Sequence, residues 1–267
     1  MLRFTSLASG SQGNCLVVES GATRVLVDCG LSARETVRRL ARRGLEPESL
    51  RAILVTHEHE DHLGGVNALA ATYGLEVVLT RGTLAAQREA DTARRADAGA
   101  AASDGVRMQL IDGRAPFAID DLEVRPFTVP HDAREPVQYV LSDGARRLGV
   151  LTDLGGPTAH VIEMLSGCEA LVLECNHALD LLWGGGYPRW LKARIGGPLG
   201  HLDNDAAAAL LAALDRSRLQ HVIAAHLSEQ NNRPELARAA LAGALGCAPE
   251  WIGLATQAEG FGWRELD

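Results

Sequence analysis

Short blocks of apolar residues separated by glycine and polar turns dominate the chain, and most of these blocks have the length and composition of strands. The block 52–55 is entirely apolar and runs straight into Thr56, as a buried strand does. The predicted strands are 16–19, 24–28, 52–55, 76–79, 107–111, 117–119, 122–129, 137–141, 147–151, 170–174 and 221–225, with a final strand pair near the end of the chain. The predicted helices are 32–43, 63–73, 83–101, 205–214 and 234–244, with another after Asp153.

These elements form two mostly-strand halves, each flanked by helices. That order favours the α/β class and a four-layer αββα sandwich. Residues 183–203 contain tryptophan, glycine and proline, and we expect them to form a long ordered loop with a short helix. The sequence has no evident internal repeat and no linker, so we expect residues 1–267 to form one domain.

Three histidines and one aspartate lie within six residues, directly after the predicted strand at 52–55. The segment 56–62 reads THEHEDH. Imidazole nitrogens and carboxylate oxygens are preferred ligands of zinc and related divalent ions. We expect His57 and His59 to face one ion, and Asp61 and His62 to face a second.

Three further candidate ligands come within two residues of the end of a predicted strand. They are His131, Asp153 and His226, and we expect Asp153 to bridge the two ions. A single histidine or aspartate at a strand end is more often structural. Four strand ends that all present ligand types instead favour a metal site made of seven side chains.

The net charge of −8 argues against a general nucleic-acid binder, because such proteins usually carry a basic face. Two divalent cations would add about four positive charges at the place where a phosphate must lie. The basic residues are also clustered, at Arg38, Arg39, Arg42 and Arg43, at Arg94 and Arg95, and at Arg189, Lys192 and Arg194. Arginine suits phosphate recognition, although a bias in coding composition explains its excess more simply.

These residues resemble the metallo-β-lactamase superfamily over nearly the whole chain. The HxHxDH signature of that superfamily is matched at 57–62, its later ligands at His131, Asp153 and His226, and its early aspartate at Asp28. The resemblance implies a dinuclear metal centre. Zn²⁺ is the default metal for histidine and aspartate ligands, and Mn²⁺ is the alternative.

Several short blocks resemble the YycJ/WalJ-type family within that superfamily. They are SGSQGNC at 9–15, PHDA at 130–133, ECNH at 174–177, GYP at 186–188, GHLDN at 200–204 and HLSEQNN at 226–232. The resemblance implies exonuclease activity on double-stranded DNA and a part in DNA repair. The pattern is also similar to ribonuclease Z, which implies that Glu174 and His201 form a proton-donating pair. The long substrate-gripping arm of the tRNA-processing type is not evident in the sequence.

We therefore expect a two-metal hydrolase that acts on phosphodiesters in nucleic acid, with DNA favoured. Two ions about 3.5–4 Å apart would share a water, lower its pKa towards 7 and make it the nucleophile. The expected catalytic residues are Asp61, Glu174 and His201. His201 would be the general acid and Glu174 would fix its tautomer. The alternative is that His201 is a structural residue at the start of the helix 205–214.

The alternative function is a small-substrate metallohydrolase, such as a cyclic phosphodiesterase, a thioesterase or a lactonase. The fold hosts all of these, so the cleft must decide. A shallow cleft beside Arg189, Lys192 and Arg194 would suit a polymer, and a closed apolar pocket would suit a thioester.

Candidate substrate contacts are less specific. His177 lies beyond the strand 170–174 and could contact phosphate or metal, or bond to the backbone as a loop histidine. Ser228 and Asn231 could bind phosphate, although the asparagines before Pro234 also have the composition of a turn.

The remaining composition points to a reduced, intracellular protein. Five cysteines are scattered without disulfide-like or CxxC spacing. The start of the chain lacks the pattern of a signal peptide, and no apolar run approaches the roughly 18 residues that cross a bilayer. We expect a cytoplasmic location and no membrane partner.

Overall fold

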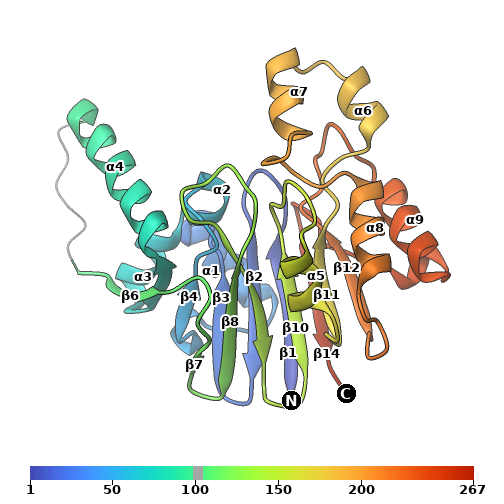
Figure 1. The fold of residues 1–267 in the computed structure, drawn as a ribbon. Coiled ribbons are helices and arrows are strands. Elements are labelled where there is room, and N and C mark those ends of the chain that lie inside the picture. The colour runs from blue at the N-terminus through green and yellow to red at the C-terminus, as the bar shows by residue number, and fades with distance from the viewer. Residues whose placement is uncertain (99–104) are drawn as a thin grey trace.

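Two seven-stranded sheets pack face to face in the computed structural model, which describes residues 1–98 and 105–267 (Figure 1). The first sheet has the order β14-β1-β2-β3-β4-β5-β6 and contains β1 (Leu2–Ala8), β2 (Cys15–Ser20), β3 (Thr23–Val27), β4 (Ala52–Leu54), β5 (Glu76–Thr80), β6 (Arg107–Ile111) and β14 (Phe261–Glu265). The second has the order β13-β12-β11-β10-β9-β8-β7 and contains β7 (Phe117–Ile119), β8 (Leu122–Thr128), β9 (Val137–Ser142), β10 (Arg147–Leu151), β11 (Ala170–Glu174), β12 (His221–Ala225) and β13 (Gly253–Leu254).

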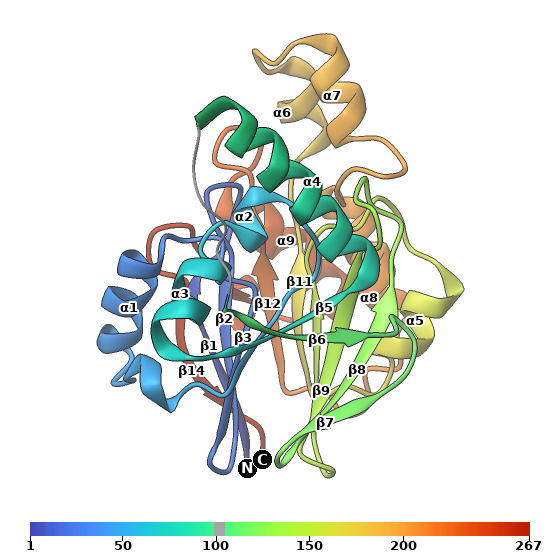
Figure 2. The ribbon, with the colours of Figure 1, turned by 90° about the vertical axis from the view of Figure 1, so that its left-hand side faces the viewer.

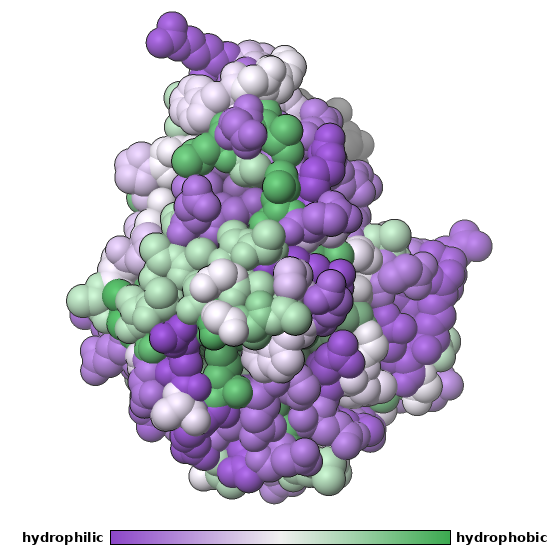
Figure 3. Space-filling model, turned by 90° about the vertical axis from the view of Figure 1, so that its right-hand side faces the viewer, coloured by the Kyte–Doolittle hydropathy of each residue, from purple (hydrophilic) through white to green (hydrophobic). Residues whose placement is uncertain are grey.

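Helices cover the outer face of each sheet. The first sheet is covered by α1 (Ala33–Arg42), α3 (Val66–Tyr73) and α4 (Arg81–Ala98), and the second by α5 (Ala159–Leu165), α8 (Asn204–Ala213) and α9 (Pro234–Leu245). The alanine-rich α8 and α9 give this side of the molecule a broad, weakly hydrophobic surface (Figure 3). Three shorter helices lie at the upper edge of the sheets, namely α2 (Glu60–Leu63), α6 (Leu179–Gly184) and α7 (Arg189–Ile195).

Three hydrophobic clusters hold these layers together. The cluster between the sheets includes Phe4, Val18, Tyr139 and Val150. The outer clusters include Leu40 and Leu69 on the first sheet, and Leu165, Leu210 and Leu241 on the second. Each fully buried leucine of this kind contributes roughly 1.5–3 kcal/mol. The four-layer αββα sandwich predicted from the sequence is therefore confirmed.

The two strands predicted at the end of the chain are present as β13 and β14, but they do not pair with each other. β14 pairs with β1 in the first sheet, while β13 pairs with β12 in the second. Phe261 on β14 packs edge-to-face on Phe4 of β1, with ring centroids 5.7 Å apart, so the chain end closes the first sheet. β1 itself was missed, because nearly all its side chains are buried and it lacks the alternation that marks a half-exposed strand.

Two helix predictions also differ from the structure. The predicted helix 63–73 is divided into α2 and α3, because the backbone at Gly65 passes so close to Leu31 that a Cβ would lie 1.9 Å from its carbonyl oxygen. The segment 183–203 contains the short helix that was predicted there, α7, and also the end of α6. The predicted helix 83–101 corresponds to α4, and its last residues, 99–101, lie outside the residues that the structure describes.

The two ends of the chain lie together at one edge of the sandwich, and α6 and α7 project from the opposite edge (Figure 2). Within each sheet, parallel strands point their carboxyl ends at this second edge, because β3 to β6 and β10 to β13 pair in parallel. Open α/β sheets bind their ligands at such an edge. In the described part of the chain, no helix combines the length and apolar character needed to span a bilayer.

Candidate metal centre

The predicted ligands gather at this edge because they come from the ends of strands in both sheets. Asp28 and His57 follow β3 and β4, His131 follows β8, Asp153 follows β10, Glu174 ends β11, and His226 follows β12. Asp61 and His62 lie on α2, which begins after the β4 end. Side chains that are up to 198 positions apart in the sequence, from Asp28 to His226, thus meet in one place.

The backbone is strained at three of these strand ends. Asp28, Asp153 and His226 have φ angles of 61°, 68° and 54°, in the left-handed region that residues other than glycine rarely adopt. Such strain costs on the order of 1–3 kcal/mol per residue and persists only where the surroundings enforce it. Here it turns the three side chains towards a common centre.

His57, His59 and His131 form the first group of ligand atoms. His59 Nδ1 lies 3.0 Å from His57 Nε2 and 3.3 Å from His131 Nε2. Their other ring nitrogens have partners elsewhere. His59 Nε2 lies 3.2 Å from the Asp132 carbonyl oxygen, and His131 Nδ1 lies 3.0 Å from that of Gly200.

Those partners fix which nitrogens carry protons. A carbonyl oxygen only accepts, so His59 Nε2 and His131 Nδ1 are the protonated nitrogens. The Thr56 hydroxyl donates to Asp28 and therefore accepts from His57 Nδ1, at 2.9 Å. The nitrogens that face one another thus carry lone pairs, with no proton between them, and three converging lone pairs fit a cation.

Asp61, His62 and His226 form the second group. Asp61 Oδ2 lies 3.5 Å from His62 Nε2 and 3.3 Å from His226 Nε2. His62 Nδ1 donates to Asp28 Oδ2 at 2.8 Å, so in the neutral ring Nε2 carries the lone pair. Asp28 therefore orients the His62 ring.

Asp153 lies between the two groups. Its buried Oδ2 accepts no hydrogen bond from the described residues, yet it lies 2.8 Å from His62 Nε2. Its Oδ1 lies 3.2 Å from His226 Nδ1. A buried carboxylate oxygen without a proton donor is costly unless a cation pairs with it. The donor set as a whole, five imidazole groups with the carboxylates of Asp61 and Asp153, therefore fits divalent ions.

The buried acids raise the affinity of the nearby histidines for protons. Burial lowers the pKa of His226, but Asp153, Asp61 and Glu174 raise it to about 9. At the first group burial dominates and holds the pKa of His57 well below its ordinary value. The centre therefore binds either protons or metal ions, depending on pH.

Glu174 and His201 stand beside the centre as a close pair. His201 Nδ1 lies 2.8 Å from Glu174 Oε1 and 3.1 Å from Asp153 Oδ1. Although burial opposes both shifts, this contact holds the pKa of His201 well above its ordinary value and lowers that of Glu174 to about 2. Glu174 Oε2 also accepts from the backbone N–H of Leu154 and Leu202, which fixes the carboxylate.

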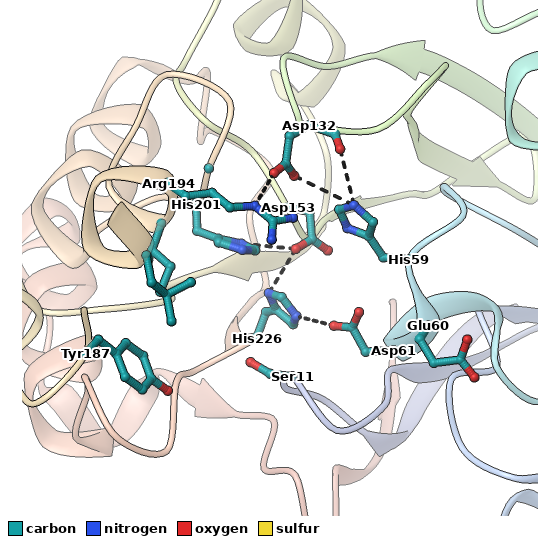
Figure 4. Close-up of a pocket in the computed structure, with 13 residues that line it drawn as sticks. Ser11, His59, Glu60, Asp61, Asp132, Asp153, Tyr187, Arg194, His201 and His226 are labelled. Carbon is teal, nitrogen blue, oxygen red and sulfur yellow. Dashed lines mark hydrogen bonds and ion pairs between the residues drawn. The ribbon is translucent and has the colours of Figure 1, made fainter. Parts of the chain in front are cut away.

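A cleft of about 340 Å³ opens over the centre (Figure 4). Its lining includes Ser11, His59, Glu60, Asp61, Asp132, Asp153, Tyr187, Leu191, Arg194, Ile195, Gly200, His201 and His226. The lining is rich in charged groups, and His201 and His226 are drawn at its floor beside Asp153.

The three predicted substrate contacts lie outside this cleft. His177 is buried, with Nδ1 3.3 Å from Asn176 Oδ1, and its Nε2 has no partner among the described residues. Ser228 Oγ accepts from the backbone N–H of Asn231, as in the turn that the sequence offered as the other interpretation. Ser228 lines a separate cavity beside Pro234 instead.

One of the predicted basic clusters, on α1, serves the fold. Arg39 Nη1 donates to the carbonyl oxygens of Leu7 and Gln257, and Arg43 donates to that of Ser6, so these α1 side chains fasten the helix to the first sheet. The side chains of Arg94 and Arg95 lie outside the described ones. From the third cluster, Arg194 lines the cleft.

Several cleft or centre residues were not singled out from the sequence, among them Asn14, Asp132 and Tyr187. Asn14 Nδ2 lies 3.1 Å from His62 Nε2, and Asp132 Oδ1 lies 3.7 Å from His59 Nε2. Tyr187 lines the cleft. The blocks SGSQGNC, PHDA and GYP contain these residues. The resemblance of these blocks to the family could therefore have indicated them, although their residue types alone could not.

The fold and this cluster of histidines and carboxylates define a class, the metallohydrolases of the metallo-β-lactamase fold. Residues 23–226 match the family model described as the beta-lactamase superfamily domain. The chain belongs to the metallo-β-lactamase superfamily, as the resemblance predicted.

Its relatives narrow the class. The chain is 36% identical over 237 residues to the exodeoxyribonuclease YycJ of Bacillus anthracis, a match that covers 89% of this chain and 86% of that protein. It is 32% identical over 253 residues to the exodeoxyribonuclease WalJ of Streptococcus pneumoniae, covering 94% and 91%. The crystal structure of YhfI, a metallo-β-lactamase fold protein from Bacillus subtilis, has a TM-score of 0.71 at 15% identity over 99% of this chain and 100% of that chain, and so shares the fold. The predicted resemblance to the YycJ/WalJ-type family is confirmed.

Proposed function

We propose that the protein is a two-metal phosphodiesterase that degrades DNA from a strand end. The single observation that carries this proposal is the position of the Glu174–His201 pair directly beside two groups of ligand atoms that share Asp153. A proton donor next to a dinuclear centre suits a reaction with a strongly basic leaving oxygen, as in a phosphodiester.

Seven side chains are proposed as metal ligands. They are His57, His59, Asp61, His62, His131, Asp153 and His226. When bound, two divalent cations lower the pKa of a coordinated water and neutralise charge on the phosphoryl group. Zn²⁺ is the metal that the histidine-rich donor set favours, with Mn²⁺ as the alternative.

The protein's own groups would complete the reaction. His201 donates a proton to the leaving sugar oxygen, and Glu174 holds the imidazole with Nε2 directed away from the carboxylate. Asp61 orients one side of the centre, since its backbone oxygen accepts from Asn14 N–H at 2.7 Å while its carboxylate faces His62 and His226. The raised pKa of His201 supports its role as an acid near neutral pH.

The substrate class is inferred from the cleft and the relatives. A lining that contains Asp132, Glu60 and Arg194 suits a charged substrate better than the apolar acyl chain of a thioester. The relatives named exodeoxyribonucleases support DNA over RNA or a small diester.

The test is hydrolysis by the metal-loaded protein of end-labelled single- and double-stranded DNA, matched RNA and bis-p-nitrophenyl phosphate. We expect stepwise release of nucleotides from DNA, abolished by a chelator and restored by Zn²⁺ or Mn²⁺. Asp153→Asn should remove metal binding and activity together. Hydrolysis of a thioester or lactone, with no phosphodiester cleaved, would overturn the proposal.

A further inference from the structure

One wall of the cleft belongs to a small helical unit, residues 179–195, which contains α6 and α7 and is called the cap below. Tyr187, Leu191, Arg194 and Ile195 all line the cleft. Their spacing of four, seven and eight residues puts them on one side of α7 and its entry. Figure 4 shows Tyr187 and Arg194 across the cleft from Asp61. The cap therefore offers an aromatic ring and a guanidinium group to whatever lies over the centre.

Arg194 can exchange its partner for a phosphate. Its Nε now lies 2.6 Å from Asp132 Oδ2, in a pair whose arginine side chain is 57% exposed. Exposed pairs of this kind contribute little free energy, and guanidinium binds phosphate oxygens at least as well as carboxylate. Asp132 would keep a neighbour, since its Oδ1 lies 3.7 Å from His59 Nε2, the nitrogen of that ring that carries the proton.

Lys192, by contrast, is occupied within the cap. Its ammonium group donates to the carbonyl oxygens of Trp183 and Gly185, at 2.8 and 2.7 Å. These bonds join α7 to the end of α6 and so hold the wall of the cleft in shape. Arg189 lies on the same helix but does not line the cleft. Arg194 is thus the lining residue of the predicted basic cluster.

The dimensions of the cleft limit what can lie against this wall. About 340 Å³ is at the lower end of the range for small-ligand sites, roughly 300–1,000 Å³. Such a volume suits one nucleotide. A single unpaired terminal nucleotide therefore fits the cleft better than a base pair does.

We propose that Tyr187 and Arg194 clamp the terminal nucleotide of a single nucleic-acid strand. Tyr187 stacks on the base, and Arg194 pairs with a backbone phosphate, while the scissile phosphate lies over the centre. Base stacking on aromatic side chains is tolerant of sequence, so the clamp selects an unpaired end rather than a base. This inference rests on the proposed function and specifies its substrate.

The test is binding of an internally labelled single-stranded oligonucleotide, measured by fluorescence anisotropy with the metal-loaded protein. A His201→Ala background keeps all seven proposed ligands and slows turnover. Tyr187→Ala should weaken binding about tenfold, and Tyr187→Phe should leave it near the starting value. Arg194→Ala should weaken binding several-fold. Arg189→Ala, which removes the same charge from the same helix, should not.

An oligonucleotide that lacks the terminal base allows a thermodynamic cycle, in which the ring and the base are removed singly and together. Loss of the base should lower the affinity about tenfold when Tyr187 is present. It should not lower the affinity of Tyr187→Ala protein any further, because the two changes remove the same contact. Metal content per chain and thermal melting should be unchanged by Tyr187→Ala, which shows an intact centre.

Two outcomes overturn the clamp. One is unchanged affinity in Tyr187→Ala protein. The other is that removal of the terminal base lowers the affinity equally whether or not the Tyr187 ring is present. If the cycle holds while wild-type protein hydrolyses no phosphodiester, the proposed function fails and the clamp stands.

Discussion

At the scale of single residues, the pair Glu174–His201 gives the sharpest expectation. Glu174 is buried and fixed by two backbone N–H groups, so its carboxylate cannot turn away from His201 Nδ1. His201 is only partly exposed, and it lines the cleft. A general acid placed this way matters in proportion to the basicity of the leaving group.

His201→Ala should therefore slow DNA hydrolysis by about 10²–10⁴-fold and leave the bound metal in place. Hydrolysis of bis-p-nitrophenyl phosphate should fall much less, because p-nitrophenolate leaves without a proton. The measurement is kcat on both substrates with metal content per chain. Equal losses on the two substrates would count against proton donation, and near-normal turnover on DNA would remove His201 from the mechanism.

The second prediction at this scale concerns the metal-free protein. Burial opposes protonation of His226, but Asp153, Asp61 and Glu174 raise its pKa to about 9, above the ordinary value near 6.5. Its contribution to stability is then complete below pH about 6.5 and is lost as pH rises to about 9, on the order of 3 kcal/mol.

The chelated protein should therefore melt at a lower temperature at pH 9 than at pH 6.5. Metal-loaded protein should show no such loss, because bound metal replaces the proton. The comparison needs thermal melting at both pH values, with His226→Gln as the variant that flattens the slope. A chelated protein that gains stability over this interval would contradict the account.

The sequence could predict the seven proposed ligands because each is a metal-binding residue type at a strand end or in the segment 56–62. It could not predict Asp132 or Tyr187 as cleft residues, since nothing local separates them from ordinary loop residues. The substrate roles of His177 and Ser228 stay predictions. Both residues belong to family-like blocks, but neither lines the cleft: the carbonyl oxygen of His177 accepts from Asn204 N–H, and the Ser228 hydroxyl accepts from Asn231 N–H.

At the scale of elements, close backbone contacts fix the loops that carry the ligands. A Cβ on Gly30 would lie 1.8 Å from the carbonyl oxygen of Asp61, so the loop after β3 and the start of α2 touch directly. Cys29 N–H also donates to the His62 carbonyl oxygen at 2.8 Å. The position of Asp61 thus depends on a segment 31 residues earlier.

Gly30→Ala should push these two segments apart, destabilise the protein by about 1–3 kcal/mol and weaken metal binding. Gly243→Ala is the matched control, because this exposed glycine lies within α9 and a Cβ there meets nothing within 4 Å. It should stabilise the protein by about 0.5–1 kcal/mol. Denaturant unfolding and metal titration of both variants give the comparison. Normal metal affinity in Gly30→Ala protein would show that the contact is unimportant.

Element prediction succeeded where the period of the pattern was clear and failed where tertiary contacts decide. The strands 107–111 and 117–119, for example, match β6 and β7. The pairing of β13 and β14 depends on partners more than 20 residues away in sequence, β12 and β1, which no local pattern reveals. The split between α2 and α3 depends on the approach of Leu31, which is likewise non-local.

At the scale of the whole molecule, the charge distribution limits how the protein holds nucleic acid. The net charge is −8, and Arg194 is the one arginine or lysine among the described residues that line the cleft. The α1 arginines hold the helix to the first sheet. Binding should therefore rely on the metal centre and the cap rather than on a broad basic face.

The affinity for single-stranded DNA should consequently fall less than about tenfold between about 50 and 200 mM salt, as one or two phosphate contacts predict. Anisotropy titrations of the His201→Ala protein with metal bound would measure the slope. A thousandfold loss, typical of six or more phosphate contacts, would indicate a basic surface outside the cleft.

That residues 1–267 form a single domain stays a prediction. The central claim concerns a smaller region, the seven side chains around Asp153. Anomalous diffraction from crystals grown with Zn²⁺ or Mn²⁺ tests it most directly. The account predicts two peaks about 3.5–4 Å apart, one among His57, His59 and His131, the other among Asp61, His62 and His226, with Asp153 touching both. A single peak, or metal bound elsewhere while these side chains keep their present contacts, would contradict it.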